Sequence, residues 1–460
     1  MITSSSSAIR QQSKKIDTII KGFITEYELT QTPIEVSFRA LLPELRTERF
    51  THLIHTYPAK LLVHIPYFFL NNTIFSKPGD TVLDPFCGTG TVLLEALLAG
   101  RNALGADANP LARLIAEVKT VRCSDARLKK TLELILKIKD CDGIVPVPSV
   151  VNIDYWFNPN NKSSLSHILQ SINEVQDQHL KNFFLVCFSN LVKKVSFADP
   201  RVSVPVRLNE KRYKEDSQSF IKVKKRLSDL ENVNVYEKFS TICVENIHRM
   251  SLLNKHFTDT TEAVNATVIA TDARNLTDGI VSLIKHPDES IQLIVTSPPY
   301  AGAQKYIRSS SLSLGWLGIA STDELRALDK LNIGRENYSK GECQIKLTGI
   351  KSCDILIDKI SNINPLRAQI VSNYVIEMQS AIRESIRVLK KDGYFVMIVG
   401  NNKVCGFEFS TQQYLTEYIE KQGLELVFKL IDDIKSYGLM TKRNKTADII
   451  SREWVLVFRK

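Results

Sequence analysis

The sequence predicts an α/β protein built on a doubly wound, mostly parallel sheet with a largely helical insertion. Three observations lead to this prediction. Residues 80–110 alternate a short apolar run, a glycine turn, a helix-forming run and a second apolar run. Further apolar runs recur at 266–271, 291–295 and 393–400. Two intervals between these runs are much longer than the ~2–6 residues of an ordinary βα loop, so they must hold additional structure.

The first glycine turn joins a strand to a helix. Thr81 to Leu83 predict the strand, Thr91 to Leu98 predict the helix, and Gly100 ends it. Between them, Gly88 and Gly90 permit a tight turn and leave bare backbone at the positive end of the helix. A ligand is therefore expected to lie against this turn.

An acidic residue, Asp107, ends the second strand of this pattern, residues 102–106. Its distance along the chain from the turn suits a carboxylate that accepts hydrogen bonds from a ribose diol. The turn lacks the third glycine of the dinucleotide fingerprint and the Gly-Lys-Ser/Thr of a phosphate-binding loop. The pattern thus differs from both of those sites.

A second turn, Thr296-Ser-Pro-Pro-Tyr300, follows the β-branched run at 291–295. Two prolines end the strand abruptly and donate no backbone hydrogen bonds. The turn therefore presents carbonyl oxygens, the Ser297 hydroxyl and the ring of Tyr300. An exocyclic amino group on a nucleobase requires such acceptors, together with a ring for stacking.

These two motifs resemble those of class I S-adenosylmethionine-dependent DNA amino-methyltransferases. The turn is similar to their (D/N/S)PPY tetrapeptide, and Asp84-Pro-Phe-Cys-Gly-Thr-Gly90 resembles their cofactor motif. The resemblance implies a Rossmann-like methyltransferase sheet with an antiparallel edge strand. It implies catalytic roles for Ser297, Pro298, Pro299 and Tyr300. It implies cofactor contacts from Tyr57, Pro58, Lys60, Asp84, Pro85, Phe86, Cys87, Gly88, Gly90, Asp107, Ala108, Asp272 and Ala273.

Alternatives stay open for several of these residues. The stretch from His55 to Lys60 resembles an H-x-Y-P-A-K segment that lies over the methionine end of the cofactor. His55 could equally be a structural histidine and Lys60 a solvated helix residue. Asp272, which by resemblance receives the adenine amino group, could be a turn-forming residue after an edge strand, and Cys87 is expected to be a packing residue.

The motif spacing predicts the domain organisation. Residues 1–33 form an N-terminal extension, 34–120 the first part of the core, 121–263 an insertion, and 264–460 the second part. The second part contains a long connection at 301–366, a helix over about 369–390 and a strand at 393–400. Two further strands, 424–430 and 453–458, are expected to form the antiparallel edge pair.

The insertion is the expected DNA-recognition domain. Residues 128–138 and 164–194 have helical apolar spacing, and a basic stretch with interleaved aromatics follows. A solvated helix face is the alternative for this stretch. The nucleic-acid contacts expected here and elsewhere are Arg201, Arg207, Lys211, Arg212, Lys222, Lys224, Lys225, Arg226, Tyr306, Arg308, Lys442 and Arg443.

Composition agrees with a cytoplasmic enzyme that has a polyanionic partner. The 60 Lys and Arg exceed the 50 Asp and Glu, which gives a formal charge of +10. The N-terminus lacks the apolar region of a secretory signal, and no apolar stretch is long enough to span a bilayer. The eight cysteines include no C-x-x-C pair, so neither a disulfide framework nor a metal site is predicted.

Together these features predict methyl transfer from S-adenosylmethionine to the amino group of a base flipped out of double-stranded DNA. Serine at position 297 favours cytosine N4, because relatives with SPPY more often act on cytosine and those with DPPY on adenine N6. A restriction endonuclease or another defence protein is the expected partner. The alternatives are an adenine-N6 enzyme, a guanine-N2 methyltransferase of tRNA, and a non-catalytic nucleic-acid-binding protein.

Overall fold

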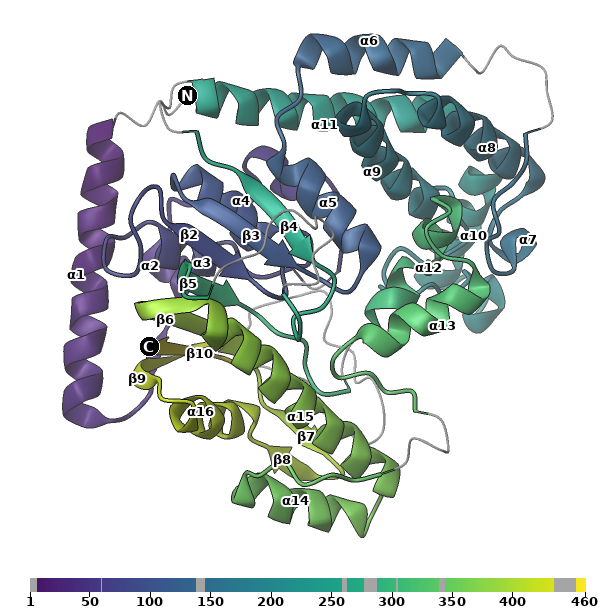
Figure 1. Ribbon diagram of the computed structural model, residues 1–460. Helices are drawn as coiled ribbons and strands as arrows, with labels where there is room; N and C mark the ends of the chain where they lie inside the picture. Colours follow the sequence, from purple (N-terminus) through teal and green to yellow (C-terminus); the bar gives the residue numbers. More distant parts are fainter. Residues whose placement is uncertain are drawn as a thin grey trace.

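A single eight-stranded sheet organises the computed structural model (Figure 1), which describes residues 6–58, 60–137, 145–258, 263–276, 288–302, 305–338, 344–433 and 452–460. The strand order is β1-β9-β10-β6-β5-β2-β3-β4. The strands are β1 (Ile34–Val36), β2 (Thr81–Asp84), β3 (Asn102–Ala106), β4 (Ala266–Ala270), β5 (Ile291–Thr296), β6 (Leu389–Val399), β9 (Glu425–Asp433) and β10 (Arg452–Arg459). β7 (Asn402–Val404) and β8 (Phe407–Phe409) form a separate hairpin.

The predicted doubly wound sheet is confirmed. β2, β3 and β4 pair in parallel on one side, whereas β5 and β6 continue in parallel on the other side of β2. β10 is antiparallel to both β6 and β9, as expected for the C-terminal pair. A short strand that the sequence did not predict, β1, pairs in parallel with β9 and takes the edge position. β9 and β10 thus form the expected antiparallel pair at this side of the sheet, with β1 outside β9.

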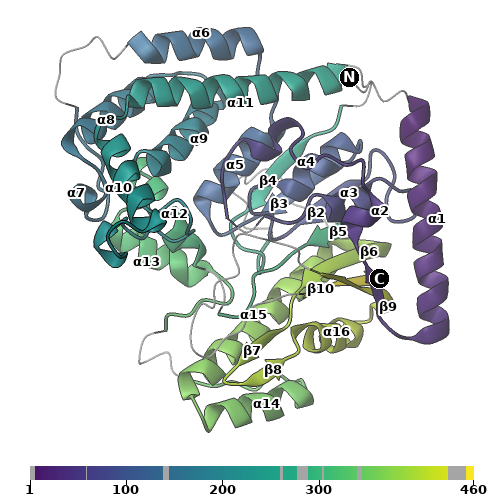
Figure 2. The same cartoon turned by 180° about the vertical axis from the view of Figure 1, so that it is seen from behind.

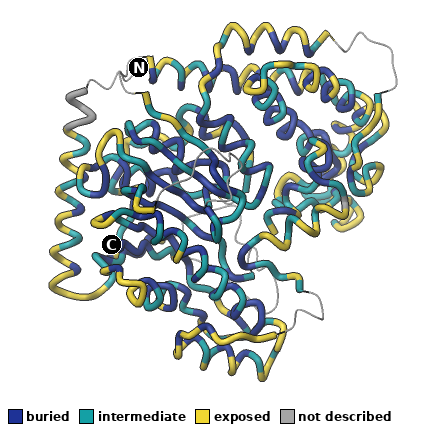
Figure 3. The backbone as a smooth tube through the Cα atoms, in the orientation of Figure 1, coloured by how far each residue is buried: buried dark blue, intermediate teal, exposed yellow. Residues whose placement is uncertain are grey.

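The two faces of the sheet are covered by different helices (Figures 1 and 2). Neighbouring residues such as Val82 and Leu83 contribute to different cores, because side chains alternate across a strand. One core includes residues of α1 (Ser6–Thr30), α2 (Phe38–Leu41), α3 (His64–Leu70) and α4 (Thr91–Leu98). The other includes α14 (Lys351–Ser361), α15 (Pro365–Val388) and α16 (Thr411–Lys421). The sheet is consequently the most buried layer, as Figure 3 shows.

Three helices begin with the same Asn-Pro signal. Asn109, Asn158 and Asn364 each accept a backbone N–H of the first turn, and each is followed by a proline at the first helical position. Asn109 caps α5 (Pro110–Thr120), which follows β3. The cap fixes the point at which the chain turns away from the carboxyl end of β3.

A helical lobe, residues 125–258, lies beside the sheet on the α5 side (Figure 1). It contains α6 (Asp125–Leu136), α7 (Ile153–Trp156), α8 (Pro159–Asn173), α9 (Gln178–Lys194), the 3-10 turn η3 (Glu210–Arg212), α10 (Gln218–Glu231) and α11 (Val235–Thr258). The helical stretch expected at 164–194 is divided, because Asp177 caps a new helix after α8 ends. The helical character expected of this segment is confirmed.

The lobe also receives part of the long connection that follows residues 296–300, the predicted catalytic turn. α12 (Tyr306–Trp316) packs against α9, and α13 (Thr322–Leu331) packs against α12. Trp316 is fully buried, with its ring 5.5 Å from Phe157 and 6.1 Å from Phe188. Residues of the helical lobe and of α12 therefore share one apolar core.

The N-terminal extension contains α1, which packs against β9 at the margin of the sheet (Figure 1). Ile16 and Ile20 of this helix are fully buried. Within the described ranges, the structure contains no helix with the length and apolar composition needed to cross a bilayer.

Candidate active site

A cavity lies where the carboxyl ends of β2, β3, β4 and β5 meet. This location is the ligand crevice of doubly wound sheets. The cavity is lined by Tyr57, Pro85, Phe86, Gly88, Asp107, Ala108, Thr271, Asp272, Ala273, Ser297, Pro299, Tyr306, Leu331, Asn332 and Ile333. It thus combines residues predicted for the cofactor with residues predicted for the target base.

The glycine turn after β2 is shaped by two left-handed residues. Gly90 has φ +73°, and a Cβ there would lie 3.0 Å from that of Ala116, so the approach of α5 requires glycine. Gly88 has φ +49°, but a Cβ there would meet no protein atom within 4 Å. Because Gly88 also lines the cavity, its open side leaves room for a ligand against the backbone.

The carboxylate of Asp107 is fixed at the end of β3. Its oxygens accept the backbone N–H groups of Gly88 at 2.9 Å and Asn109 at 2.8 Å. Burial raises the pKa of this carboxyl, and these two hydrogen bonds offset part of the rise. A carboxylate held in this way is suited to the hydroxyls of a ribose.

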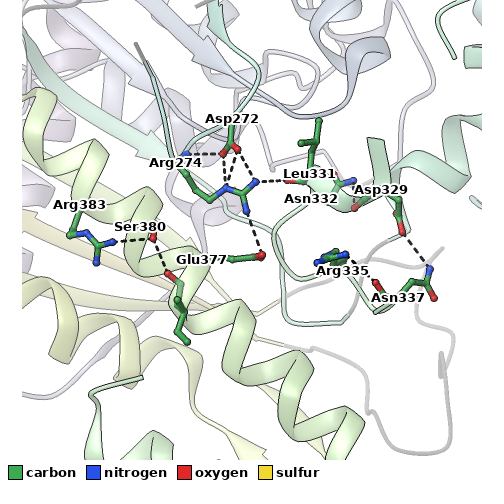
Figure 4. A network of polar contacts seen from close by, with 11 residues as sticks. Asp272, Arg274, Asp329, Leu331, Asn332, Arg335, Asn337, Glu377, Ser380 and Arg383 are labelled. Carbon is green, nitrogen blue, oxygen red and sulfur yellow. Dashed lines mark hydrogen bonds and ion pairs between the residues drawn. The ribbon is translucent and has the colours of Figure 1, made fainter. Parts of the chain in front are cut away.

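Asp272 lines the same cavity beyond the end of β4, and its carboxylate is paired with Arg274 (Figure 4). The guanidinium donates from Nε to Oδ1 at 2.9 Å and from Nη2 to Oδ2 at 2.7 Å. This bidentate pairing fixes the orientation of the carboxylate. Sequence reasoning singled out Asp272 and missed Arg274.

Asp84 and Cys87 do not line the cavity, although both were predicted to contact the cofactor. The Asp84 carboxylate accepts the Thr296 hydroxyl at 2.6 Å and the Phe86 N–H at 3.1 Å. Cys87 is buried, and its Sγ would lie 2.9 Å from a Cβ at Gly105. Its surroundings match the packing role that was expected.

The segment from His55 to Lys60 contributes one residue to the cavity, Tyr57, whose hydroxyl accepts Asn109 Nδ2 at 2.8 Å. Lys60, by contrast, donates from Nζ to the carbonyls of His52 and His55 at 3.3 and 2.5 Å. His55 Nε2 lies 3.0 Å from Ser189 Oγ, and burial lowers the pKa of His55 to about 3. These contacts correspond to the structural alternative for His55. Lys60 lies outside the helices, so it is not the solvated helix residue of its alternative. Pro58 is half-buried and outside the cavity lining.

The catalytic turn enters the cavity through Ser297 and Pro299. Tyr300 is half-buried, and its hydroxyl donates to Glu453 Oε1 on β10 at 2.9 Å. Burial and the neighbouring Glu453 raise the pKa of Tyr300, so the hydroxyl keeps its proton. Pro298 is buried beneath the turn and outside the cavity lining.

Four wall residues come from the long connection at 301–366. Tyr306, the first residue of α12, was expected to contact nucleic acid and lies in the cavity wall. Leu331, Asn332 and Ile333 were missed. No local sequence signal marks them, because their position depends on how the end of α13 returns to the sheet.

The predicted nucleic-acid residues fall into three groups. Arg201, Arg207 and Arg226 have partners within the lobe: Arg201 pairs with Asp199, Arg207 lies over the Tyr155 ring, and Arg226 donates to a backbone carbonyl. The exposed side chains are Lys211, Arg212, Lys222, Lys224, Lys225 and Arg308. Lys442 and Arg443 lie outside the described residues.

Comparisons with known proteins agree with this arrangement. A family model described as DNA methylase matches residues 44–117, which include the glycine turn and Asp107. The Type II methyltransferase M.MvaI of Kocuria varians is 27% identical over 425 residues, covering 88% of each chain. The family model and this relative support the S-adenosylmethionine-dependent DNA amino-methyltransferase family. The family predicted from the motifs is therefore confirmed.

Other relatives of this methyltransferase family are more distant. The Type II methyltransferase M.AvaI of Nostoc sp. is 23% identical over 384 residues, covering 78% of this chain and 76% of that protein. A solved putative DNA modification methylase from Thermus thermophilus, in complex with S-adenosylmethionine, is 19% identical with a TM-score of 0.20. It covers 41% of this chain and 53% of that one. Because this TM-score is low, the fold assignment rests on the strand order itself.

S-adenosylmethionine is the cofactor of this family, and the cavity residues fit it. Carboxylates at the ends of β3 and β4, Asp107 and Asp272, can accept hydrogen bonds from ribose hydroxyls and an adenine amino group. Phe86 supplies an apolar surface, and Gly88 leaves its backbone open. Two acceptors, an apolar surface and an open glycine are the features that a nucleoside requires.

Proposed function

We propose that this protein is a site-specific DNA methyltransferase that methylates the N4 amino group of a cytosine. One observation carries the proposal: Ser297 and Pro299 line the same cavity as Asp107 and Asp272. A base at the catalytic turn and a cofactor on the two carboxylates would therefore be neighbours. That proximity is the requirement for direct methyl transfer.

The cofactor, when bound, supplies an electrophilic methyl group on a sulfonium. We assign Asp107 to the ribose hydroxyls and Asp272 to the adenine amino group. Tyr57 closes the cavity from the segment that precedes β2. Gly88 lets the ligand approach the backbone, since a side chain there would enter the space beside the turn.

The catalytic turn would hold the target amino group. The Ser297 hydroxyl and the Pro298 carbonyl accept hydrogen bonds from its two N–H groups, which draws electron density toward the attacking nitrogen. When the methyl group moves from sulfur to nitrogen, the thioether leaves and one N–H proton is released to solvent. The Tyr300 ring stacks on the base, while its hydroxyl stays bonded to Glu453. The base must leave the duplex to reach this position, because its amino group is otherwise paired and stacked. No covalent bond between protein and base is needed.

Cytosine N4 is proposed because position 297 is serine. A neutral hydroxyl and an aspartate can each accept an amino proton, so adenine N6 is the closest competing target. We favour cytosine N4 because relatives with SPPY more often act on cytosine. The choice concerns the base and leaves the mechanism unchanged.

The exposed basic side chains on η3 and α10 would contact the DNA phosphates. Lys211, Arg212, Lys222, Lys224 and Lys225 lie in one part of the lobe, and the chain carries a net charge of +10. Contacts of this kind position a duplex without reading its sequence. Arg308 extends the basic set onto α12, the helix that begins with the cavity residue Tyr306.

We further propose a restriction–modification setting. M.MvaI and M.AvaI, each similar over more than three quarters of this chain, carry the name Type II methyltransferase. Methylation of one recognition sequence would protect host DNA from a restriction endonuclease of the same specificity.

Mass spectrometry of nucleosides tests the proposal. Genomic DNA and total RNA are incubated separately with the protein and isotope-labelled S-adenosylmethionine, then digested. Labelled N4-methylcytosine in DNA is expected. Labelled N6-methyladenine would overturn the choice of base. Label in RNA alone would indicate an RNA methyltransferase. Absence of both label and cofactor binding would support a non-catalytic protein. A Ser297→Ala variant should lose the label.

A further inference from the structure

Residues 331–334, named here the wall segment, connect the two halves of the proposed active site. Leu331, Asn332 and Ile333 line the cavity, and the segment begins with Leu331, the last residue of α13. Figure 4 shows Leu331 and Asn332 beside Arg274. Ile333 is buried, with 6% of its surface exposed. The segment is therefore a built part of the cavity wall.

One end of the wall segment is tied to the adenine-side carboxylate. Arg274 donates from Nη2 to the carbonyl of Leu331 at 3.2 Å while pairing with Asp272 through two nitrogens (Figure 4). Its Nη1 lies 3.4 Å from Glu377 Oε1 on α15. A single guanidinium thus connects β4, the wall segment and α15 in a fixed planar geometry.

The other end of the wall segment is tied to the catalytic turn. The Gly334 carbonyl accepts the N–H of Gly302, two residues after Tyr300, at 3.1 Å. Gly334 has φ +79°, and a Cβ there would lie 2.9 Å from the Tyr300 carbonyl oxygen. Only glycine allows this approach of the segment to the turn.

We infer that Arg274 is a positioning residue that couples cofactor binding to the order of the catalytic turn. An amino group that donates to Asp272 competes with Arg274 for the carboxylate oxygens, and Arg274 also contacts Leu331 and Glu377. Leu331 lies three residues before Gly334, whose carbonyl is bonded to Gly302 and whose backbone lies against the Tyr300 carbonyl. The inference rests on the proposed function, because it takes the adenosyl group as the ligand of Asp272.

Hydrogen exchange in the presence of S-adenosylhomocysteine tests the inference without DNA or turnover. In the wild-type protein, S-adenosylhomocysteine should slow exchange in peptides that contain the Gly302 and Gly334 amides by about tenfold, within the range of ordinary site coupling. In Arg274→Gln this protection should fall below about twofold at saturating ligand, with saturation verified by calorimetry. Arg274→Lys, which keeps the charge and loses the planar fork, should be intermediate.

Two further variants separate coupling from folding and from ligand binding. Arg383→Gln removes an arginine of α15 that bonds Tyr418 and Ser380, and it should keep the full protection. Gly334→Ala leaves Asp272 and Arg274 in place, so at saturating S-adenosylhomocysteine it should lose protection at Gly302. This variant decides the question if Arg274→Gln no longer binds the ligand. The inference would be overturned by normal protection in Gly334→Ala or in ligand-saturated Arg274→Gln. It would also be overturned if the wild type binds the ligand without protection. If the wild type does not bind the ligand at all, the proposed function is overturned instead.

Discussion

The Thr296 hydroxyl donates a hydrogen bond to Asp84 Oδ1 at 2.6 Å across 212 residues of sequence. Thr296 is the last residue of β5 and is fully buried, and Asp84 is the last residue of β2. The bond therefore joins the start of the catalytic turn to the start of the cofactor turn. It fixes the positions of the two turns relative to each other at the carboxyl edge of the sheet, beneath the cavity.

Replacement of Thr296 by Val should destabilise the protein by about 1–3 kcal/mol. The change keeps the shape of the side chain but leaves the buried Asp84 carboxyl without its hydroxyl donor. Urea denaturation would measure the loss. Thr267→Val, at a half-buried threonine on β4, is the control and should change stability by less than about 1 kcal/mol. Equal effects of the two substitutions would show that the bond contributes no net stability.

The pH dependence of stability should contain a contribution from Asp84. Burial raises the pKa of its carboxyl to about 7, and the bond from Thr296 offsets part of the rise. A carboxyl with a raised pKa holds its proton more tightly in the folded state. Its stabilising contribution is thus complete below the unfolded value of 3.8 and is lost as pH rises toward 7.

Asp84→Asn should remove this dependence. Between about pH 4 and pH 7 the slope of the unfolding free energy against pH should differ from that of the wild type by up to about 1.4 kcal/mol per pH unit. The amide still accepts the Thr296 hydroxyl, so the fold should persist. Denaturation series at several pH values would measure both slopes, and parallel curves would contradict the prediction.

The sequence predicts the parts of the site that depend on strand ends. Asp107, Asp272 and Ser297 each follow an apolar run, and the carboxyl ends of parallel strands meet at one edge. Their presence in one cavity therefore follows from local patterns once the sheet is inferred. The same reasoning located Gly88 and Gly90, because left-handed turns leave a direct glycine signal.

Other parts of the site depend on tertiary paths that local patterns do not encode. The wall segment lies against Asp272 because α12 and α13 pack on the helical lobe and then return to the sheet. Lys60 belongs to the segment that resembles H-x-Y-P-A-K, yet its ammonium group donates hydrogen bonds to the carbonyls of His52 and His55. The edge strand β1 has only three residues, too few for a periodic signal.

Substitutions in the catalytic turn should slow methyl transfer without weakening cofactor binding. Ser297→Ala and Tyr300→Ala should each lower the single-turnover rate of methyl transfer by about 100-fold or more, since small misplacements of the base have effects of that size. Cofactor affinity, measured by calorimetry, should change little. Tyr300→Phe keeps the ring and loses only the bond to Glu453, so it should retain more activity than Tyr300→Ala. A parallel loss of rate and cofactor affinity would indicate that the turn is structural.

Asn109 should hold the aromatic side of the cavity in place. Its Nδ2 donates to the Tyr57 hydroxyl at 2.8 Å and to Ser310 Oγ at 3.0 Å, while its Oδ1 caps α5. Asn109→Ser keeps a good cap but lacks the amide donor. Cofactor affinity should fall about tenfold, which corresponds to ~1.4 kcal/mol.

The matched control for Asn109 is Asn158→Ser. Asn158 caps α8 in the same way and is also followed by proline, but it belongs to the helical lobe and does not line the cavity. Its replacement should leave cofactor affinity unchanged. If both variants weaken cofactor binding equally, the effect of Asn109→Ser is a general loss of helix capping.

Charge reversal on α10 should weaken DNA binding in a salt-dependent way. Lys224 and Lys225 are adjacent and exposed, and the double change to Glu removes up to two phosphate contacts. The slope of log affinity against log salt should become shallower by roughly 0.9 for each lost contact. Fluorescence anisotropy with a labelled duplex at several salt concentrations would measure it. Lys129→Glu with Lys130→Glu, an adjacent exposed pair on α6, changes the net charge equally and should leave the slope nearly unchanged. Equal slopes in the two double variants would identify the basic stretch of α10 as a solvated helix face.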